Sequence, residues 1–313
     1  MNDPVVAFTG VQRWFGSHVV LRGLDLRIEP GQVYALLGRN GSGKSTALRI
    51  LLGFLQPHRG SATVFGVDSG ALGPRERGRI GYVGEEHRLY PTMTVAGACA
   101  FERGTRPGFR SDFVARALQR TGLRPGQPIV RLSRGQRATL CLILAVAAQP
   151  ELLVCDDPAL GLDVVMRREF LDVLIDLLAD TGCTVLFSSH FLADVERIAD
   201  RVGFLHDGAL AVDAPLEQIK QRVLRASWSP RGGASVPSSP HVLRATARSS
   251  GHELLLLDAP GELLAQLRAT GDLAPPTAPS LEDLFVGLLG PERPGILAEP
   301  MESLRAAASA GGS

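Results

Sequence analysis

The segment GRNGSGKST, residues 38–46, constrains the fold more than any other part of the sequence. It fits the pattern GxxxxGK[ST] and lies between a short apolar run, VYALL, and a helical run, TALRILLGF. Glycines at this spacing let backbone N–H groups turn toward one phosphate, and the positive end of the following helix favours the same anion. The segment therefore predicts a phosphate-binding loop between a buried strand and a helix.

Each position of this loop has an expected role in binding a nucleoside triphosphate. Lys44 is expected to reach the β- and γ-phosphates, Ser45 to ligate Mg²⁺, and Thr46 to contact the backbone or the α-phosphate. The whole chain has only two lysines, Lys44 and Lys220, which argues against the alternative of a glycine-rich surface turn with a generic lysine. The predicted ATP-binding residues of the loop are Gly38, Arg39, Asn40, Gly41, Ser42, Gly43, Lys44, Ser45 and Thr46.

The residues around this loop predict an α/β fold. The near-continuous apolar runs VYALLG, IGYVG, LLVCD and TVLFSS have strand length and are typical of a parallel sheet buried on both faces. Near the N-terminus, VVAFTG, SHVVLRGL and LDLRIEPG alternate and turn as separate strands of an antiparallel meander do. Between residues 86 and 131, TVAGACAFERG and SDFVARALQRTG predict two helices of a small insert. The expected architecture is a P-loop NTPase core with flanking helices, an antiparallel β region and a helical subdomain.

The composition changes near residue 225. The stretch SWSPRGGASVPSSP is typical of a loop or linker. After it, HVLRATARS and HELLLLDA predict strands, and GELLAQLRATG and SLEDLFVGLLG predict helices, the second capped by Ser280 and ended by Gly290. We therefore expect an ATPase domain over residues 1–220, a small α+β accessory domain over 221–290 and a flexible tail over 291–313.

Charge and cysteine content exclude several classes of protein. Thirty-three basic and 32 acidic residues give a net charge of +1, so no global positive field would attract nucleic acid. The longest apolar stretch, ATLCLILAVAA, is shorter than the roughly 20 residues of a membrane helix, and the acidic N-terminus does not resemble a signal peptide. We expect a cytoplasmic chain without a nucleic-acid partner, with reduced cysteines at positions Cys99, Cys141, Cys155 and Cys183.

Two adjacent aspartates follow the apolar run LLVC. An acidic turn at the end of a buried strand is the simplest interpretation, but the upstream phosphate loop gives each aspartate a separate expected role. Asp156 would hold the magnesium ion beside Ser45, through water. Asp157 would point across the strand end toward the γ-phosphate and act as the base that orients the attacking water.

The order of five motifs, GRNGSGKST, IGYVGEE, LSRGQR, LLVCDDPALGLD and FSSH, resembles the nucleotide-binding subunit of ABC transporters, over residues 1 to about 220. The resemblance is to the exporter type, such as antibiotic and multidrug export ATPases. It implies ATP and Mg²⁺ as cofactors, and ATP held between the subunits of a head-to-tail dimer. The implied signature, which would bind the γ-phosphate held by the other subunit, is Leu132, Ser133, Arg134, Gly135 and Gln136. By itself, LSRGQR would equally fit an ordinary capped helix start.

The resemblance implies roles for four more residues. His190 would contact the γ-phosphate and the attacking water, although a histidine after a strand is often a simple cap. Asp163 would communicate across the dimer. Phe15 would stack on adenine, with the adjacent Trp14 as an alternative and a core aromatic as the simpler interpretation. Glu85 replaces the usual glutamine and would still ligate Mg²⁺ or order water, but it cannot donate as an amide does.

Two further positions depart from the family pattern. Ala159 stands where serine or threonine is usual, which removes a polar contact. Asp157 stands where glutamate is usual, and its shorter side chain withdraws the carboxylate by more than about one ångström, enough to reduce the rate roughly a hundredfold. We therefore expect intact ATP binding with slow hydrolysis. Paired exporters often combine one such weakened site with a sound signature.

The resemblance also implies a partner in the membrane. Since the sequence contains no membrane span, a separate permease subunit would form the pore, and Tyr90, Pro91 and Met93 would be exposed anchors for it unless they pack within the helical insert. SLEDLFVGLL resembles the accessory domain of exporter-type cassettes, which favours export. We expect a homodimer, or a heterodimer with a second ABC subunit, at the inner face of the cell membrane. The competing hypothesis is a soluble ABC ATPase or nucleotide-gated regulatory protein without a transport role.

Overall fold

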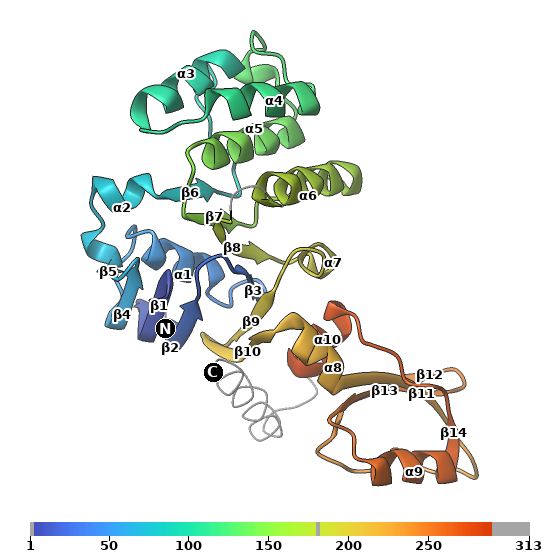
Figure 1. The fold of residues 1–313 in the computed structure, drawn as a ribbon. Helices are drawn as coiled ribbons and strands as arrows, with labels where there is room; N and C mark the ends of the chain where they lie inside the picture. Colours follow the sequence, from blue (N-terminus) through green and yellow to red (C-terminus); the bar gives the residue numbers. More distant parts are fainter. Residues whose placement is uncertain (1–2, 180–181, 290–313) are drawn as a thin grey trace. The chain divides into compact units, whose positions relative to one another are not determined.

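The computed structural model describes residues 3–179 and 182–289, which divide into two compact units (Figure 1). The first unit contains residues 3–179, 182–194 and 205–210, and the second contains residues 195–204 and 211–289. The expected tail over 291–313 and the helix stop at Gly290 lie outside the described residues.

A parallel sheet forms the centre of the first unit. Four strands lie side by side in the order β3 (Val33–Leu37), β8 (Thr184–Ser189), β7 (Leu152–Asp156) and β6 (Ile80–Val83), and each neighbouring pair is parallel. All six residues of β8 are buried. The four apolar runs therefore form a parallel sheet whose inner strand β8 is covered on both faces, while Tyr82 of the edge strand β6 is exposed. In such sheets ligands bind at the carboxyl ends of the strands.

Helices flank this sheet, and the two expected helices of the insert are present. Thr94 caps α3 by accepting a hydrogen bond from the Gly97 N–H at 3.1 Å. Together with α5, the helices α3 and α4 form the helical part drawn at the top of Figure 1. The helices of this unit, including one that ends at its boundary, are α1 (Lys44–Leu51), α2 (Pro74–Gly78), α3 (Val95–Thr105), α4 (Ser111–Thr121), α5 (Arg134–Ala147), α6 (Val164–Ala179) and α7 (Leu192–Val195).

An antiparallel sheet completes the first unit. Its order is β2-β1-β4-β5, with bounds β1 (Val6–Phe15), β2 (His18–Ile28), β4 (Arg59–Val64) and β5 (Val67–Asp68). The expectation of separate strands in SHVVLRGL and LDLRIEPG was wrong, because both belong to the single strand β2. Gly23 adopts a φ of 97°, and register shifts between β1 and β2 absorb the break in alternation without ending the strand.

The second unit contains an antiparallel sheet in the order β12-β13-β11-β14. The Asp283 N–H donates to the Ser280 hydroxyl at 3.1 Å, which is the expected cap of the last described helix. The bounds are β11 (Val223–Pro230), β12 (Val242–Arg248), β13 (Gly251–Leu257), β14 (Gly271–Leu273), α8 (Leu216–Arg222), α9 (Gly261–Thr270) and α10 (Leu281–Leu289), and β9 (Arg201–His206) and β10 (Ala209–Pro215) form a hairpin whose tip belongs to the first unit.

Part of the expected linker is in fact a strand. Residues 227–230 of SWSPRGGASVPSSP belong to β11, which lies inside this sheet between β13 and β14. The reason is Trp228, whose side chain is completely buried and whose Nε1 donates to the Leu267 carbonyl at 2.8 Å. An aromatic core residue therefore outweighs the turn-forming residues around it.

We predict that Trp228→Phe lowers the free energy of unfolding by about 1–3 kcal/mol, because the buried Leu267 carbonyl loses its short hydrogen bond from Nε1 and keeps only the longer contact with Thr270 Oγ1, at 3.5 Å. Urea unfolding followed by circular dichroism measures the change. The other tryptophan, Trp14, is the matched control, since it is only partly buried, and Trp14→Phe should cost less. Equal stability of Trp228→Phe and the parent would contradict the assignment of this residue to the core.

Candidate functional site

The loop between β3 and α1 has a backbone that only glycine fits. Gly41 and Gly43 adopt φ angles of 81° and 109°, in the left-handed region. A Cβ atom at Gly43 would lie 2.8 Å from Leu21 Cδ2, and one at Gly38 would lie 2.6 Å from the Leu205 carbonyl oxygen. The loop therefore has the tight geometry that the sequence predicts, with α1 beginning at Lys44.

Lys44 is held by the loop that precedes it. Its side chain is buried, with 8% exposed, and Nζ donates to the carbonyls of Gly38 at 2.8 Å and Arg39 at 3.2 Å. Burial lowers the pKa of this amine, while the charges of Asp157 and then Asp156 raise it. The two carbonyls thus stabilise a buried cation close to two carboxylates.

Asp156, at the end of β7, forms hydrogen bonds with hydroxyl groups from two other elements, α1 and β8. Its Oδ1 accepts hydrogen bonds from Ser45 Oγ at 3.2 Å and from Ser188 Oγ at 2.9 Å. A hydroxyl from the first turn of α1 and a carboxylate are the hard oxygen donors that Mg²⁺ prefers. The residues present therefore fit a magnesium ion bound between Ser45 and Asp156.

Sequence reasoning missed Ser188. Its carbonyl and its hydroxyl both accept from the Asp157 N–H, at 3.1 Å and 3.0 Å, while the hydroxyl donates to Asp156. Asp156 and Ser188 are direct partners in the parallel pairing of β7 and β8. Aligning the carboxyl ends of the two predicted strands would have placed this serine beside the aspartates.

Asp157 is strained and only partly satisfied. Its φ of 46° is rare for a residue with a side chain, and such strain is concentrated at functional sites. Oδ2 lies 2.6 Å from His190 Nδ1, whereas Oδ1 is buried and has no hydrogen-bond partner among the described residues. Burial raises the pKa of this carboxyl, and the contacts with His190 and Lys44 partly oppose the rise. One buried carboxylate oxygen therefore remains available to accept from a water.

His190 follows β8 and is joined directly to Asp157. Because a carboxylate oxygen accepts, Nδ1 donates in this contact and Nε2 is left for another group. The sequence predicted an acid and a histidine at separate positions, and the structure brings them together as a pair. The ring of Phe191 packs against the imidazole, with 3.8 Å between the ring centroids, and limits its movement.

Glu85 lies just after β6 on the same edge of the sheet. It is exposed, and both Asp156 and Glu85 contribute to the raised pKa of the Tyr82 hydroxyl, after burial as the main cause. The negative charges of both carboxylates therefore act on the same phenol. This position is compatible with the expected role of Glu85 in ligating magnesium or ordering water.

The segment LSRGQ forms a capped helix start. The Gln136 N–H donates to Ser133 Oγ at 3.1 Å, and Gln136 Oε1 accepts from the Ser133 N–H at 3.1 Å. Since the serine oxygen accepts here, its own hydrogen remains available for an anion. Leu132 and Gly135 are buried, and a Cβ atom at Gly135 would lie 2.9 Å from Met166 Cε. The Arg134 guanidinium packs over Gly161, in the turn before α6.

The remaining expected residues lie at the surface of this unit. Asp163 caps α6, with Oδ1 accepting from the Met166 N–H at 2.9 Å, and the next residues, Val164 and Val165, are 70% and 67% exposed. Ala159, by contrast, is buried, so a hydroxyl there would need a partner.

The two aromatic candidates for adenine stacking differ in availability. Trp14 is already stacked on His58, with 3.8 Å between the ring centroids. Phe15 is exposed at the end of β1, with the Arg13 guanidinium carbon 4.8 Å from its ring centroid. Of the two, Phe15 therefore has the more accessible ring.

Comparison with known proteins decides the family. The sequence profile described as "ABC transporter" matches residues 21–160. The Nod factor export ATP-binding protein I of Bradyrhizobium diazoefficiens is 31% identical over 302 residues, which cover 93% of this chain and 98% of that protein. The chain belongs to the ABC transporter ATP-binding proteins, and it is an ATPase subunit of this family.

Other ABC proteins match a smaller part of the chain. The Fe(3+) ions import ATP-binding protein FbpC 3 of Rhodococcus jostii is 31% identical over 240 residues, covering 74% of this chain and 68% of that protein. A solved structure described as the ATP binding subunit of an ABC transporter has a TM-score of 0.61 and 25% identity, over 69% of this chain and 92% of that one. The expected fold class is confirmed.

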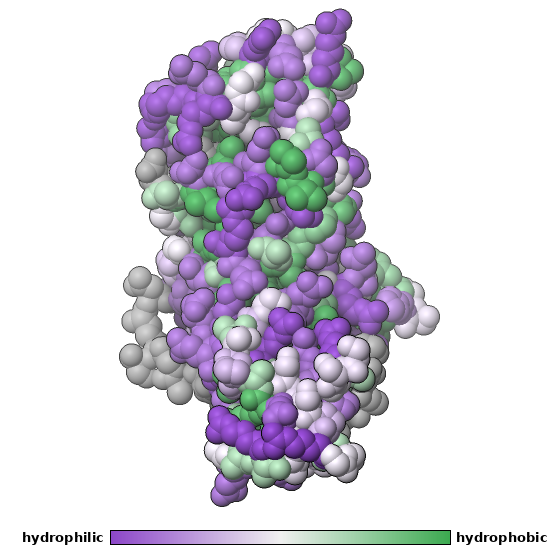
Figure 2. Space-filling view, turned by 90° about the vertical axis from the view of Figure 1, so that its right-hand side faces the viewer, coloured by the Kyte–Doolittle hydropathy of each residue, from purple (hydrophilic) through white to green (hydrophobic). Residues whose placement is uncertain are grey.

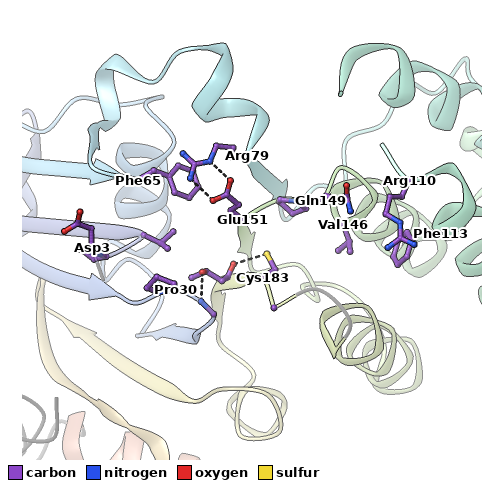
Figure 3. Close-up of a pocket in the computed structure, with 16 residues that line it drawn as sticks. Asp3, Pro30, Phe65, Arg79, Arg110, Phe113, Val146, Gln149, Glu151 and Cys183 are labelled. Carbon is purple, nitrogen blue, oxygen red and sulfur yellow. Dashed lines mark hydrogen bonds and ion pairs between the residues drawn. The ribbon is translucent and has the colours of Figure 1, made fainter. Parts of the chain in front are cut away.

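A cavity of about 550 Å³ in this ABC subunit lies away from the predicted site (Figure 3). Its lining includes Pro30, Arg79, Glu151 and Cys183, which precede the parallel strands rather than follow them. Arg79 and Glu151 form a two-bond ion pair there, at 2.5 and 2.6 Å. None of the predicted site residues lines this cavity, so cavity size does not identify the candidate site.

The raised pKa of Asp157 predicts a pH-dependent effect of Asp157→Asn. A carboxyl whose pKa is higher in the folded state binds its proton more tightly there, so the parent loses stability as pH rises from the unfolded toward the folded pKa. An asparagine has no such loss. Relative to the parent, the variant should therefore gain stability from acidic to neutral pH.

Urea unfolding of the parent and of Asp157→Asn, at acidic and at neutral pH, measures the difference in stability between them. Asp207 is the matched control, since it has the same φ of 46° but an exposed side chain, and Asp207→Asn should show no comparable gain. The same stability difference between Asp157→Asn and the parent at both pH values would show that the burial of Asp157 does not disfavour its charge.

Proposed function

We propose that this protein binds MgATP at the carboxyl edge of its parallel sheet and hydrolyses it to power export through a separate membrane permease. The observation that carries the proposal is the buried Lys44 amine, which is held by two loop carbonyls and faces Asp156 and Asp157. A cation in such a loop is prepared for an anion with several negative charges.

Binding would exchange one set of contacts for another. The Lys44 amine would leave the carbonyls of Gly38 and Arg39 for the β- and γ-phosphates, while the loop N–H groups surround the phosphate chain. Ser45 and Asp156, with Glu85 nearby, would hold Mg²⁺, which neutralises phosphate charge when bound. Phe15 would stack on the adenine ring.

Hydrolysis would use the pair formed by Asp157 and His190. The free Oδ1 of Asp157 would accept a proton from water as the water oxygen bonds to the γ-phosphorus and the bond to the bridging oxygen of ADP breaks. His190 would hold the carboxylate through Nδ1 and contact the γ-phosphate through Nε2. Because aspartate is shorter than the usual glutamate, we expect the water to lie too far for fast turnover.

A second subunit would complete the site. The Ser133 hydroxyl and the free N–H groups at the start of α5 would bind the γ-phosphate held by the opposite chain. Asp163 and the exposed Val164 and Val165 would belong to this interface. The second subunit would be another copy of this chain or a related ABC subunit.

Part of the surface of the first unit fits a protein partner. A cavity of about 300 Å³ is lined by Leu89, Tyr90, Met93 and Phe101, and Tyr90 is 58% exposed with its ring edge against Phe101. We name this cavity the docking groove and propose that it receives a cytoplasmic segment of the permease. Met93 is half-buried rather than exposed, and its backbone forms hydrogen bonds with both Tyr90 and Ile129.

The distribution of exposed apolar side chains supports such partners. Figure 2 shows apolar side chains gathered among polar ones on one face of the molecule. Among the described residues, the large exposed apolar side chains all belong to the first unit. They are Phe15, Val19, Phe54, Tyr82, Tyr90, Phe101, Val130, Val164, Val165 and Ile175.

The proposed direction of transport rests on how much of the chain each relative matches. The similarity to the Nod factor export protein extends over nearly the whole chain, whereas the similarity to the iron import protein covers about three quarters of it.

Among residues 3–179 and 182–289, no helix is long and apolar enough to span a membrane. We propose a cytoplasmic subunit bound at the inner face of the membrane. Co-purification with a polytopic membrane protein would separate this role from a soluble ABC ATPase or a nucleotide-gated regulator.

Lys44→Ala should weaken ATP binding roughly 10- to 100-fold, because hydrogen bonds to charged groups contribute about 1.5–3 kcal/mol. Equilibrium titration with MgATP measures the affinity. The only other lysine, Lys220, is bound to Glu196 at 2.6 Å in the second unit, and Lys220→Ala is the control that should leave binding unchanged. Equal affinities for both variants would remove Lys44 from the site.

Asp157→Glu should raise kcat roughly 10- to 100-fold with little change in KM, since it restores the usual reach of the base. Asp157→Asn, which cannot take the proton, should abolish turnover while keeping ATP binding. Steady-state phosphate release measures both variants. If the glutamate variant were no faster than the parent, slow hydrolysis could not be attributed to the length of this side chain.

A further inference from the structure

His87 is buried in a segment that is otherwise exposed. It is 2% exposed, between the exposed Glu86 and Arg88. Its φ of 47° is unfavourable for a residue with a side chain, and its N–H donates to the Gly84 carbonyl at 3.2 Å. The backbone therefore turns back at this residue so that the imidazole points into the protein.

The imidazole makes one short hydrogen bond. Nε2 lies 2.6 Å from the Pro158 carbonyl oxygen. Because a carbonyl only accepts, Nε2 must carry the hydrogen. Nδ1 is buried and has no hydrogen-bond partner among the described residues. A hydrogen on Nδ1 would therefore be a buried donor without an acceptor, so the favoured form is the neutral ring with no hydrogen on Nδ1.

This bond joins the docking groove to the catalytic acid. His87 lies two residues before Leu89, which lines the groove, and Pro158 directly follows Asp157. The Asp157 carbonyl in turn accepts from the Leu160 N–H at 3.0 Å, which closes a turn around Pro158. A movement of the segment before the groove would pull on this turn through a single side chain.

We propose that His87 is a positioning residue that fixes the turn after Asp157 and transmits displacement of the docking groove to the pair of Asp157 and His190. It acts through Pro158 and does not touch the reacting atoms. The proposal rests on the proposed role of Asp157 as the base. It identifies one side chain by which a bound permease segment would change the rate of hydrolysis.

Two variants separate positioning from simple packing. His87→Gln keeps an N–H donor near the position of Nε2, whereas His87→Leu keeps most of the bulk without a donor. Both residues meet the same backbone strain at φ 47°, so a difference between them reports the hydrogen bond. We expect His87→Leu to lower kcat roughly tenfold with KM for ATP within about twofold, and His87→Gln to restore kcat.

Imidazole ¹⁵N resonances of the isolated, nucleotide-free chain test the same coupling without turnover. The His190 signals should shift in His87→Leu and return in His87→Gln. His241, whose Nδ1 contacts the Leu257 carbonyl at 2.9 Å in the second unit, is the internal reference and should not move. Unchanged His190 signals in His87→Leu, or equal loss of kcat in both variants, would overturn the proposal.

A measurement on the parent protein tests the proposal even if the His87 variants do not fold. Its His87 ring should show a protonated Nε2 and a bare Nδ1, and the opposite tautomer would overturn the proposal. If the parent hydrolysed no ATP, the proposed hydrolysis would fail, and the resonances of His87 and His190 would still decide the coupling.

Discussion

The site depends on a cation buried close to two carboxylates. An amine removed from water must be compensated, and the carbonyls of Gly38 and Arg39 supply two hydrogen bonds to Lys44. The same loop contains Gly41 and Gly43, which adopt left-handed backbone angles. A polyphosphate would offer the amine stronger, charged acceptors in the same place. The protein alone therefore offsets only part of the cost of burying the Lys44 amine, and the phosphates of ATP would offset the rest.

The two adjacent aspartates are held in different ways because of one serine. Ser188 satisfies Asp156 with its hydroxyl and fixes the backbone of Asp157. Asp156 therefore sits in an ordered group of oxygens suited to a metal. Asp157 is turned away into a strained conformation with one oxygen unmet. Such a buried acid costs stability, and natural proteins retain that cost where it serves chemistry.

Local sequence signals were sufficient for much of this architecture. The phosphate loop, the four apolar strands and the helices of the insert follow from spacing within short windows, and all are present. Features that depend on contacts between residues far apart in the sequence could not be predicted from it. The continuity of β2 depends on its bulged pairing with β1, and the strand at Trp228 depends on a core formed by α9 and β13.

The same limit applies to the site. The motifs identified Lys44, Asp156 and His190 as candidates, but their mutual distances come from the pairing of β3, β7 and β8. Ser188 and His87 were missed because each acts through a residue far away in sequence, Asp156 in one case and Pro158 in the other. Their roles become visible only when the strand ends are placed side by side.

A crystal structure with Mg²⁺ and a non-hydrolysable ATP analogue would test the central claim most directly. The account predicts that Lys44 Nζ leaves the carbonyls of Gly38 and Arg39 for the β- and γ-phosphates, and that Ser45 and Asp156 approach the metal. It would be contradicted if Lys44 kept its carbonyl contacts while the nucleotide bound elsewhere, such as in the cavity at the opposite edge of the sheet.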